Sequence, residues 1–170
     1  MLRLSPIPKD AHGVTVLQQL LQEAPEYARI ATGEIASPTA ADAMFRALPP
    51  GKNYGDKFVL GAYEDELLIG CVDLIRGYPS QSVAYIGLLL VAERSTGKGY
   101  GTKIFDLICE IVIQWNCSNM IQLGILKTNP GAMRFWQKLG FKSTGESKPY
   151  ESGKTRTQVL IYQRMVPTAA

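Results

Sequence analysis

Histidine and cysteine are scarce in this chain of 170 residues. His12 is the only histidine, so neither a histidine-based catalytic triad nor a multi-histidine metal site can be assembled. The three cysteines, Cys71, Cys109 and Cys117, cannot all pair, and none has the Cys-x-x-Cys spacing of a zinc or redox site. We therefore expect reduced core thiols and no bound metal.

Long apolar runs and a strong charge imbalance are also missing. The most apolar stretch, Ile104 to Trp115, is interrupted by polar residues and falls short of the roughly 20 apolar residues of a membrane span. The N-terminal MLRLSPIPKD lacks the apolar core of a secretory signal, so the cytoplasm is the expected compartment. The net charge of +3 is too small to predict a nucleic-acid surface. Neither a membrane nor a nucleic acid is an expected partner.

Length and hydrophobic content suit one core, so residues 1–170 are interpreted as a single domain. Helical spacing predicts a helix from Val14 to about Ala28, with a break at Pro25, and a shorter helix from Thr39 to Leu48. A longer helix is expected from Tyr100 to Asn116, and another from Pro130, capped by Asn129, to Gly140.

Short apolar and β-branched runs predict most of the strands, and the last two are expected to complete the sheet as an antiparallel pair. In chain order they are Leu2–Leu4, Phe58–Tyr63, Leu67–Ile75, Ser82–Val91, Met120–Leu126, Lys142–Tyr150 and Thr155–Met165. The tail from Val166 to Ala170 is expected to fray. This order predicts an α/β fold with a mixed, mostly antiparallel central sheet of six to seven strands and helices on both faces.

A glycine-rich turn with the sequence VAERSTGKGYG, Val91 to Gly101, joins an apolar strand directly to a helix. The first amides of a helix have no intrahelical acceptors, and the helix dipole places positive charge there, so a phosphate group is favoured. Gly97, Gly99 and Gly101 let the backbone approach such a phosphate closely. Arg94 and Lys98 are expected to add mobile positive charge.

Two familiar phosphate-binding loops fit this turn poorly. A P-loop requires Ser or Thr after its lysine, whereas Lys98 is followed by Gly99. A Rossmann loop requires Gly-x-Gly-x-x-Gly early in a parallel βαβ unit, whereas this turn is Gly-x-Gly-x-Gly and follows an antiparallel meander. A protein that binds another nucleotide through this turn remains a third hypothesis.

Arg94-x-x-Gly97-x-Gly99 resembles the coenzyme A pyrophosphate loop of the GNAT acetyltransferase superfamily, Gln or Arg, two residues, Gly, one residue, then Gly or Ala. The segment from Asn129 to Phe141 resembles a second element of that family, Asn-x-x-Ala-x-x-x-aromatic-x-x-x-Gly-Phe. The resemblance covers about residues 57–165. It implies that two central strands splay apart and form the cleft for acetyl-coenzyme A, the acetyl donor.

The resemblance also implies which residues bind the cofactor. Pantetheine is expected along the strand residues Leu89, Leu90 and Val91, whose amides can polarise the thioester carbonyl. The pyrophosphate is expected on Arg94, Ser95, Thr96, Gly97, Lys98, Gly99, Tyr100, Gly101 and Thr102. The remaining cofactor contacts expected from the second element are Asn129, Ala132, Phe135 and Lys138.

Two positions depart from the family pattern. Many members have a carboxylate base where this chain has Gly87, so Tyr85 and Asp73 are the alternative candidates, either acting through water. Trp136 occupies a position that is often a tyrosine acid, and indole cannot protonate a thiolate. Because a thiol has a pKa near 8.5, its thiolate can leave unprotonated, and Tyr78 and other tyrosines remain unplaced.

The resemblance therefore predicts an N-acetyltransferase that moves an acetyl group from acetyl-coenzyme A to a primary amine by direct attack on the thioester. The acceptor is expected to be a small molecule, with a protein amine as the second choice. The alternative is a non-catalytic acyl-coenzyme A-binding module, favoured by Gly87 and Trp136. Exposed strand edges would permit a homodimer.

Overall fold

The structure, a computed structural model, describes residues 1–167, and its strands form one seven-stranded sheet in the order β1-β2-β3-β4-β5-β7-β6. All neighbouring strands are antiparallel except β4 and β5, which are parallel. The strands are β1 (Leu2–Pro6), β2 (Lys57–Glu64), β3 (Leu67–Arg76), β4 (Val83–Val91), β5 (Met120–Leu126), β6 (Lys142–Ser152) and β7 (Thr155–Met165). The mixed, mostly antiparallel sheet predicted from the sequence is thus confirmed.

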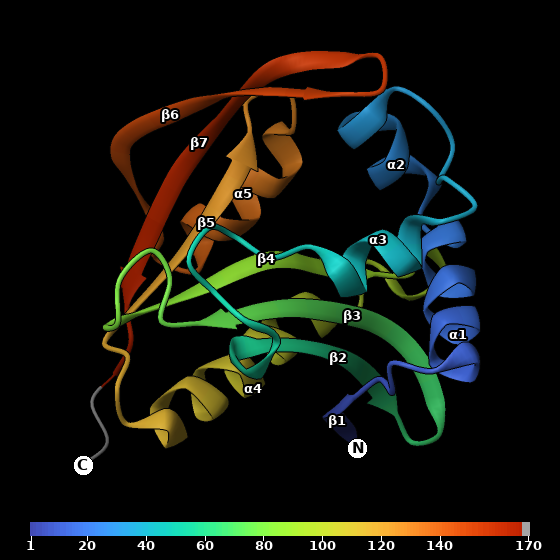
Figure 1. Cartoon of the computed structure of the whole chain (residues 1–170), viewed down its shortest axis with the longest axis horizontal. Helices are drawn as coiled ribbons and strands as arrows, with labels where there is room; N and C mark the ends of the chain where they lie inside the picture. Colours follow the sequence, from blue (N-terminus) through green and yellow to red (C-terminus); the bar gives the residue numbers. More distant parts are fainter. Residues whose placement is uncertain (168–170) are drawn as a thin grey trace.

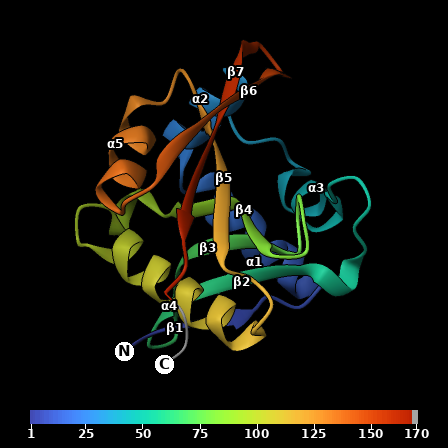
Figure 2. The same ribbon diagram turned by 90° about the vertical axis from the view of Figure 1, so that its left-hand side faces the viewer.

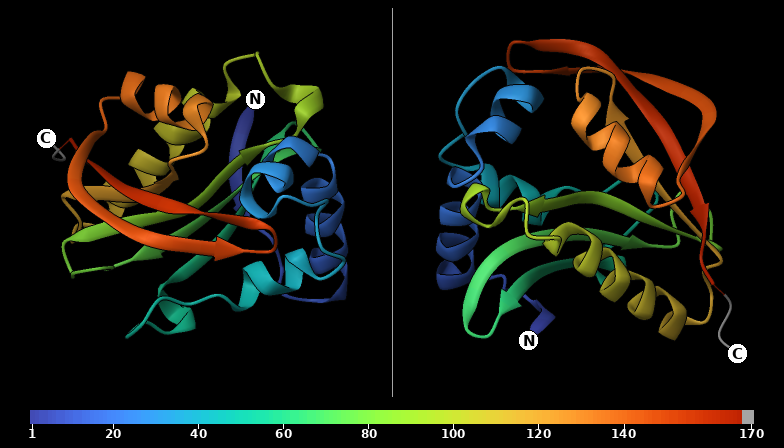
Figure 3. Two further views of the ribbon diagram at one scale, coloured as in Figure 1. Left: turned by 90° about the horizontal axis from the view of Figure 1, so that it is seen from above. Right: turned by 180° about the vertical axis from the view of Figure 1, so that it is seen from behind.

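Helices cover both faces of this sheet, as predicted (Figures 1 and 3). They are α1 (Ala11–Gln22), α2 (Pro25–Thr32), α3 (Ala40–Arg46), α4 (Tyr100–Trp115) and α5 (Pro130–Lys138), with short 3₁₀ turns at Tyr54–Asp56 and Glu93–Ser95. On one face α4 buries Phe105 and its helical neighbours against the sheet, and on the other Leu17 of α1 and Phe45 of α3 form a separate core. Within residues 1–167, no helix has the length and apolar character needed to cross a bilayer.

Two details differ from the sequence prediction. The first helical segment is two helices: α1 ends at Gln22, and Pro25 begins α2, because proline is favoured at the first helical position. The predicted frayed tail starts at Val166, but Val166 is buried and its N–H donates to Asn119 O at 2.9 Å. Residues 168–170 of that tail lie outside the described residues.

The central strands β4 and β5 diverge along their length. They pair only where Val83–Ile86 faces Met120–Leu123. Beyond that point, residues 88–91 pair with β3 alone, and residues 124–126 pair with β7 alone. Figure 1 shows β5, β7 and β6 rising away from β2, β3 and β4. The predicted splay of the central strands is therefore confirmed.

The β6–β7 hairpin reaches across to α2, at the opposite end of the chain (Figures 1 and 2). Its turn residue Lys154 donates a backbone hydrogen bond to Thr32 O at 2.7 Å. The Tyr150 hydroxyl donates to Ala31 O at 2.8 Å, and the Thr155 hydroxyl donates to the next carbonyl back along α2 at 3.3 Å. These bonds fix the hairpin and α2 together over one side of the splayed strands.

Candidate active site

A cavity of about 400 Å³ lies where β4 separates from β5. Three elements surround it: the exposed half of β4, the glycine-rich turn with the start of α4, and one side of α5. Its lining residues are Leu89, Val91, Ser95, Thr96, Gly97, Gly99, Tyr100, Gly101, Thr102, Ala132, Phe135 and Trp136. The structure thus brings most of the residues predicted to bind the cofactor together around one cavity, which we call the loop cavity.

The glycine-rich turn presents bare backbone to the loop cavity. Gly97 and Gly99 have φ values of +74° and +79°, a conformation that side chains with a Cβ rarely adopt. No atom lies within 4 Å of a Cβ built on either residue, so both face open space. Gly99 is also the N-cap of the 16-residue helix α4, and no side chain caps the helix or places a carboxylate in its first turn. The free amides and the helix dipole therefore suit an anion such as a pyrophosphate.

The two cations of the turn are placed differently. Arg94 Nε donates to Glu23 Oε2 at 2.7 Å, and Arg94 Nη2 donates to Leu68 O at 2.8 Å. Its charge is therefore fixed toward α1 and β3 rather than mobile, contrary to the expectation from the sequence. Lys98 is exposed and forms no ion pair with any residue in the described part of the chain.

The remaining predicted contacts lie around the loop cavity without lining it. Leu90 is buried and packs into the α1–α3 core. The Asn129 side-chain oxygen accepts from the Ala132 N–H at 3.1 Å and so caps α5. Lys138, in the last turn of α5, is exposed.

Trp136 lines the loop cavity although it was not predicted as a cofactor contact. Its ring also packs against Phe105, Phe135 and Phe141, with ring centroids 4.8 to 5.8 Å apart. Ala132, Phe135 and Trp136 are spaced i, i+3 and i+4, which places them on one face of α5. That helical spacing is the signal in the sequence that could have identified Trp136.

A second cavity, of about 510 Å³, lies on the other side of β4 and is called here the helix cavity. Leu88 lines the helix cavity and Leu89 lines the loop cavity, as expected for successive side chains of one strand. The full lining of the helix cavity is Leu21, Tyr27, Ala28, Ala31, Thr32, Ala36, Ser37, Ala40, Ala43, Met44, Ala47, Asp73, Gly87, Leu88 and Tyr150. The two cavities therefore lie on opposite sides of β4, at the point where it leaves β5.

Asp73 lines the helix cavity next to this part of β4. Along β3 and β4, Asp73 is opposite Leu88 and the next pair is Leu74 with Ile86, so Gly87 is an extra residue of β4 without a partner. A Cβ built on Gly87 would lie 3.0 Å from Asp73 Oδ2. The Asp73 carboxylate, coming from β3, thus occupies the space that a side chain at position 87 of β4 would enter.

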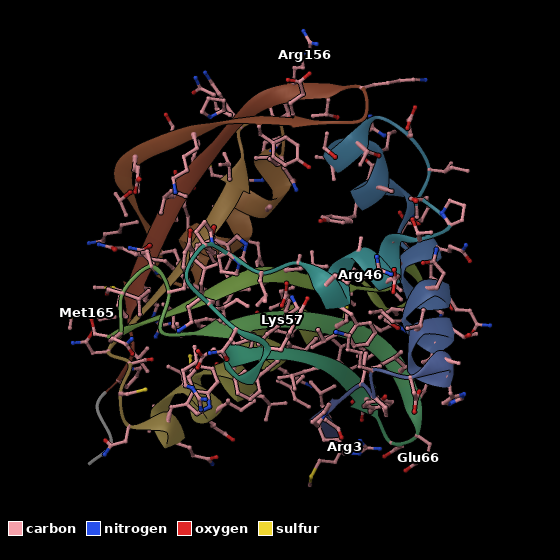
Figure 4. All side chains as sticks on the ribbon, in the orientation of Figure 1. Arg3, Arg46, Lys57, Glu66, Arg156 and Met165 are labelled. Atoms are coloured by element: carbon pink, nitrogen blue, oxygen red, sulfur yellow. The ribbon has the colours of Figure 1, made fainter. Side chains whose placement is uncertain are left out.

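The Asp73 carboxylate is paired with a buried lysine. Lys57 Nζ donates to Asp73 Oδ1 at 2.9 Å, and the side chains are only 3% and 14% exposed, respectively. Figure 4 labels Lys57, the first residue of β2, near the middle of the view. Burial raises the pKa of Asp73 above its ordinary value, and the hydrogen bond and charge of Lys57 oppose that increase. The pair leaves Oδ2 of Asp73 without a hydrogen bond from any described residue.

Tyr85, the other candidate base, lies in the part of β4 that is still paired with β5 and lines neither cavity. Its ring contacts Tyr78 edge to face, with centroids 5.3 Å apart. Burial, and to a smaller extent the neighbouring Tyr78, raises the pKa of Tyr85 above its ordinary value. Two tyrosines that no motif marked, Tyr27 and Tyr150, line the helix cavity instead.

The acetyltransferase (GNAT) family model matches residues 17–141. The chain belongs to the GNAT acetyltransferase family. The match begins in α1, well before the motif-bearing region at residues 57–165, and so includes the helices that line the helix cavity. No curated protein matches this GNAT chain by sequence.

Solved structures of other acetyltransferases share the GNAT fold of this chain. An acetyltransferase from Thermus thermophilus has a TM-score of 0.77 at 18% identity, with 97% of each chain covered. The ribosomal-protein-S18-alanine N-acetyltransferase from Escherichia coli has a TM-score of 0.69 at 11% identity, with 100% of this chain and 97% of that chain covered. An aminoglycoside 6'-N-acetyltransferase complexed with coenzyme A has a TM-score of 0.69 at 14% identity, with 99% of each chain covered.

Proposed function

We propose that this GNAT protein is a single-domain N-acetyltransferase that moves an acetyl group from acetyl-coenzyme A to a primary amine, by direct attack of the amine on the thioester. The observation that carries the proposal is that successive residues of β4, Leu88 and Leu89, line two cavities on its opposite sides where it leaves β5. One cavity suits the donor, the other suits an acceptor, and a carboxylate, Asp73, lines the second beside Gly87. We place the enzyme in the cytoplasm, with a small molecule as acceptor and a protein amine as the second choice.

The loop cavity has the features that coenzyme A requires. The open space at Gly97 and Gly99 and the uncapped N-terminus of α4 suit the pyrophosphate. Beyond Ile86, β4 has no strand on its β5 side, so its amides and carbonyls there can pair with pantetheine as an added strand would. A relative in fold has been solved as a coenzyme A complex. When bound, acetyl-coenzyme A supplies the thioester carbonyl that the amine attacks.

The same edge of β4 can stabilise the charge that develops in the reaction. A backbone N–H near Leu89 or Leu90, aimed at the thioester oxygen, is a preorganised donor of the oxyanion-hole type. Such a donor contributes roughly 10²- to 10³-fold to the rate in other enzymes. This contribution needs no side chain, so it is independent of the glycine at position 87.

Asp73 is the base in this proposal. A lysine-like amine, with a pKa of about 10.4, is mostly protonated at neutral pH and must lose a proton to become a nucleophile. Asp73 Oδ2 faces the helix cavity beside Gly87 and can accept that proton directly or through one water. Asp73 holds this first proton while the new C–N bond forms and the C–S bond breaks, and the sulfur leaves with the bonding electrons as a thiolate. The attacking nitrogen then releases a second proton to water and becomes the neutral amide nitrogen.

Two measurements test the proposal. Isothermal titration is expected to give micromolar binding of acetyl-coenzyme A, with no binding of NAD or ATP. Release of free coenzyme A thiol on addition of a primary amine is then expected, and mass spectrometry should find the acetylated amine. Binding without release by any amine, including lysine-containing peptides, would favour the non-catalytic module, and binding of ATP or NAD alone would favour another nucleotide site.

A further inference from the structure

The residues that line the helix cavity restrict the chemical class of the acceptor. Resting on the function proposed above, we infer that the acceptor is a small monoamine with an apolar body, rather than a polyamine, an amino sugar or an amino acid. Three observations carry this: the apolar lining, the position of the one charged lining residue, and the pairing of the charges around the cavity.

Apolar side chains make up most of the lining of the helix cavity. Six alanines from α2, α3 and the residues adjoining these helices line it, together with three larger apolar side chains. The alanines are Ala28, Ala31, Ala36, Ala40, Ala43 and Ala47, and the larger residues are Leu21, Met44 and Leu88. Alanine leaves room while offering no hydrogen-bonding group, so this part of the cavity favours a hydrocarbon chain or ring.

Asp73 is the one charged residue among those that line the helix cavity. It lies at the β4 end, next to Gly87, where the reacting nitrogen must be. Its partner Lys57 is 3% exposed and is not part of the lining. The cavity thus offers one negative group for one ammonium, and no positive group for a carboxylate.

The charged residues around the helix cavity neutralise one another. In the described part of the chain, three carboxylates on α2, α3 and the intervening segment are each in an ion pair: Glu26 with Arg29, Glu34 with Lys154, and Asp42 with Arg46. A second ammonium on the acceptor would have to compete with these bonded cations. An ionised group without a partner is costly to transfer into an apolar site, so a second charge of either sign on the acceptor is disfavoured.

A matched trio of acceptors tests the inference: butylamine, 1,4-diaminobutane and 4-aminobutanoate. The three share a four-carbon chain and differ at its far end, which is apolar, cationic or anionic. We expect kcat/KM for butylamine to exceed that for each of the others by about tenfold or more. In the series ethylamine, propylamine, butylamine, we expect kcat/KM to rise about fourfold for each added methylene.

A pair of variants tests whether the preference for longer alkylamines arises in the helix cavity. Ala43→Leu fills the helix cavity and is expected to lower kcat/KM for butylamine about tenfold while changing that for ethylamine little. Ala11→Leu, the same substitution at an exposed residue outside the cavity, is the control and is expected to leave the series unchanged. Titration with acetyl-coenzyme A checks that donor binding is the same in both variants.

The possible results separate this inference from the proposed function. Three results would overturn the inference and leave the N-acetyltransferase function standing. The first is a kcat/KM that does not change along the alkylamine series, and the second is faster transfer to 1,4-diaminobutane or to 4-aminobutanoate than to butylamine. The third is no transfer to butylamine by a protein that binds acetyl-coenzyme A and acetylates another amine. Failure to bind acetyl-coenzyme A would overturn the proposed function and the inference with it.

Discussion

The two cavities on either side of β4 are formed by different parts of the chain, backbone in one and side chains in the other. The loop cavity is shaped by backbone: two glycines with positive φ and the uncapped start of α4. The helix cavity is shaped by side chains: alanine methyl groups, two tyrosines and Asp73. A backbone site demands glycine at fixed spacing, whereas many apolar residues can line a side-chain site equally well.

Under the proposed function, this difference would let one chain combine a general donor site with a specific acceptor site. Main-chain amides can bind a pyrophosphate whatever the surrounding side chains are. The proposed acceptor, in contrast, would be selected by the shape and charge of side chains contributed by α2, α3 and the β6–β7 hairpin. The two sites should therefore respond to mutation independently, with effects on turnover and on donor binding that can be separated.

The largest expected effect is on the acceptor side, at Asp73. Asp73→Asn keeps the size of the side chain and removes the proposed base, so we expect kcat/KM to fall about 10²- to 10³-fold. Isothermal titration should show acetyl-coenzyme A affinity within about twofold of wild type, because Asp73 does not line the loop cavity. Activity within threefold of wild type at neutral pH would show that the base lies elsewhere, with Tyr85 as the next residue to replace.

A double variant sharpens this test by moving the carboxylate between strands. Asp73→Ala removes the atom that lies 3.0 Å from a Cβ at position 87, and Gly87→Glu then places a carboxylate in the same space from β4. We expect kcat/KM of the double variant to be at least about tenfold higher than that of Asp73→Ala alone. Recovery would show that the location of the carboxylate matters more than the strand that supplies it.

Much of the fold and of the loop cavity could be predicted from the sequence. Apolar patterning predicted most of the strands and α3 to α5 to within a few residues, because these segments have a clear apolar stripe or run and clear ends. The exposed strand β6 has no such pattern and was predicted only as the antiparallel partner of the last strand. The spacing of Arg94, Gly97 and Gly99 predicted the turn, because that backbone requires glycine. The start of α2 at Pro25 was missed, since proline is compatible with both a helix break and a helix start.

The helix cavity could not be predicted, because it depends on distances between segments far apart in the chain. Nothing local to Lys57 indicates that it pairs with Asp73; that contact follows from the β2–β3 register, in which Val59 faces Asp73 and places Lys57 diagonally from it. The hydrogen bond from Tyr150 to Ala31 joins residues 119 positions apart. The fixed orientation of Arg94 likewise depends on Glu23 in the N-terminal segment.

On the donor side, the largest expected effect is at Gly99. Gly99→Val puts a β-branched side chain at a φ of +79° and directs it into the open space proposed for the pyrophosphate. We expect the Kd for acetyl-coenzyme A, measured by isothermal titration, to rise about 10- to 100-fold.

Gly145→Val provides a matched control for backbone strain. Gly145 has a φ of +84°, faces open space and lies in β6, outside both cavities. It should lose similar thermal stability without a change in Kd. Equal loss of affinity in both variants would mean that strain, rather than the site, causes the effect.

A smaller effect on activity is expected from replacing Lys57, which opposes the rise of the Asp73 pKa. Lys57→Met removes the charge that opposes the burial-induced rise of the Asp73 pKa, so that pKa moves still higher. Because the base must be deprotonated, the acidic limb of the kcat/KM profile should shift to higher pH, with about tenfold lower activity below the limb. Wild type and variant are compared with the same amine, so the amine's own ionisation cancels.

Lys52→Met controls for the loss of a lysine from an ion pair, since Lys52 pairs with Asp56 at 2.9 Å, away from both cavities. It should leave the pH profile in place. A Lys57→Met profile that coincides with wild type while activity falls at every pH would assign Lys57 a purely structural role.

The smallest effect is expected at Arg94, where the motif and the structure favour different outcomes. If its charge contacts the pyrophosphate, Arg94→Ala should weaken acetyl-coenzyme A binding about tenfold or more. The bonds to Glu23 and to Leu68 O direct it elsewhere, so we expect the Kd to change less than about threefold. Stability should fall by about 1 kcal/mol, because the ion pair is partly exposed. Comparing Arg94→Ala, Glu23→Ala and the double variant by chemical denaturation isolates the pair. A large loss of affinity in Arg94→Ala alone would mean that the guanidinium leaves Glu23 when the donor binds, and that the donor site is not built from backbone alone.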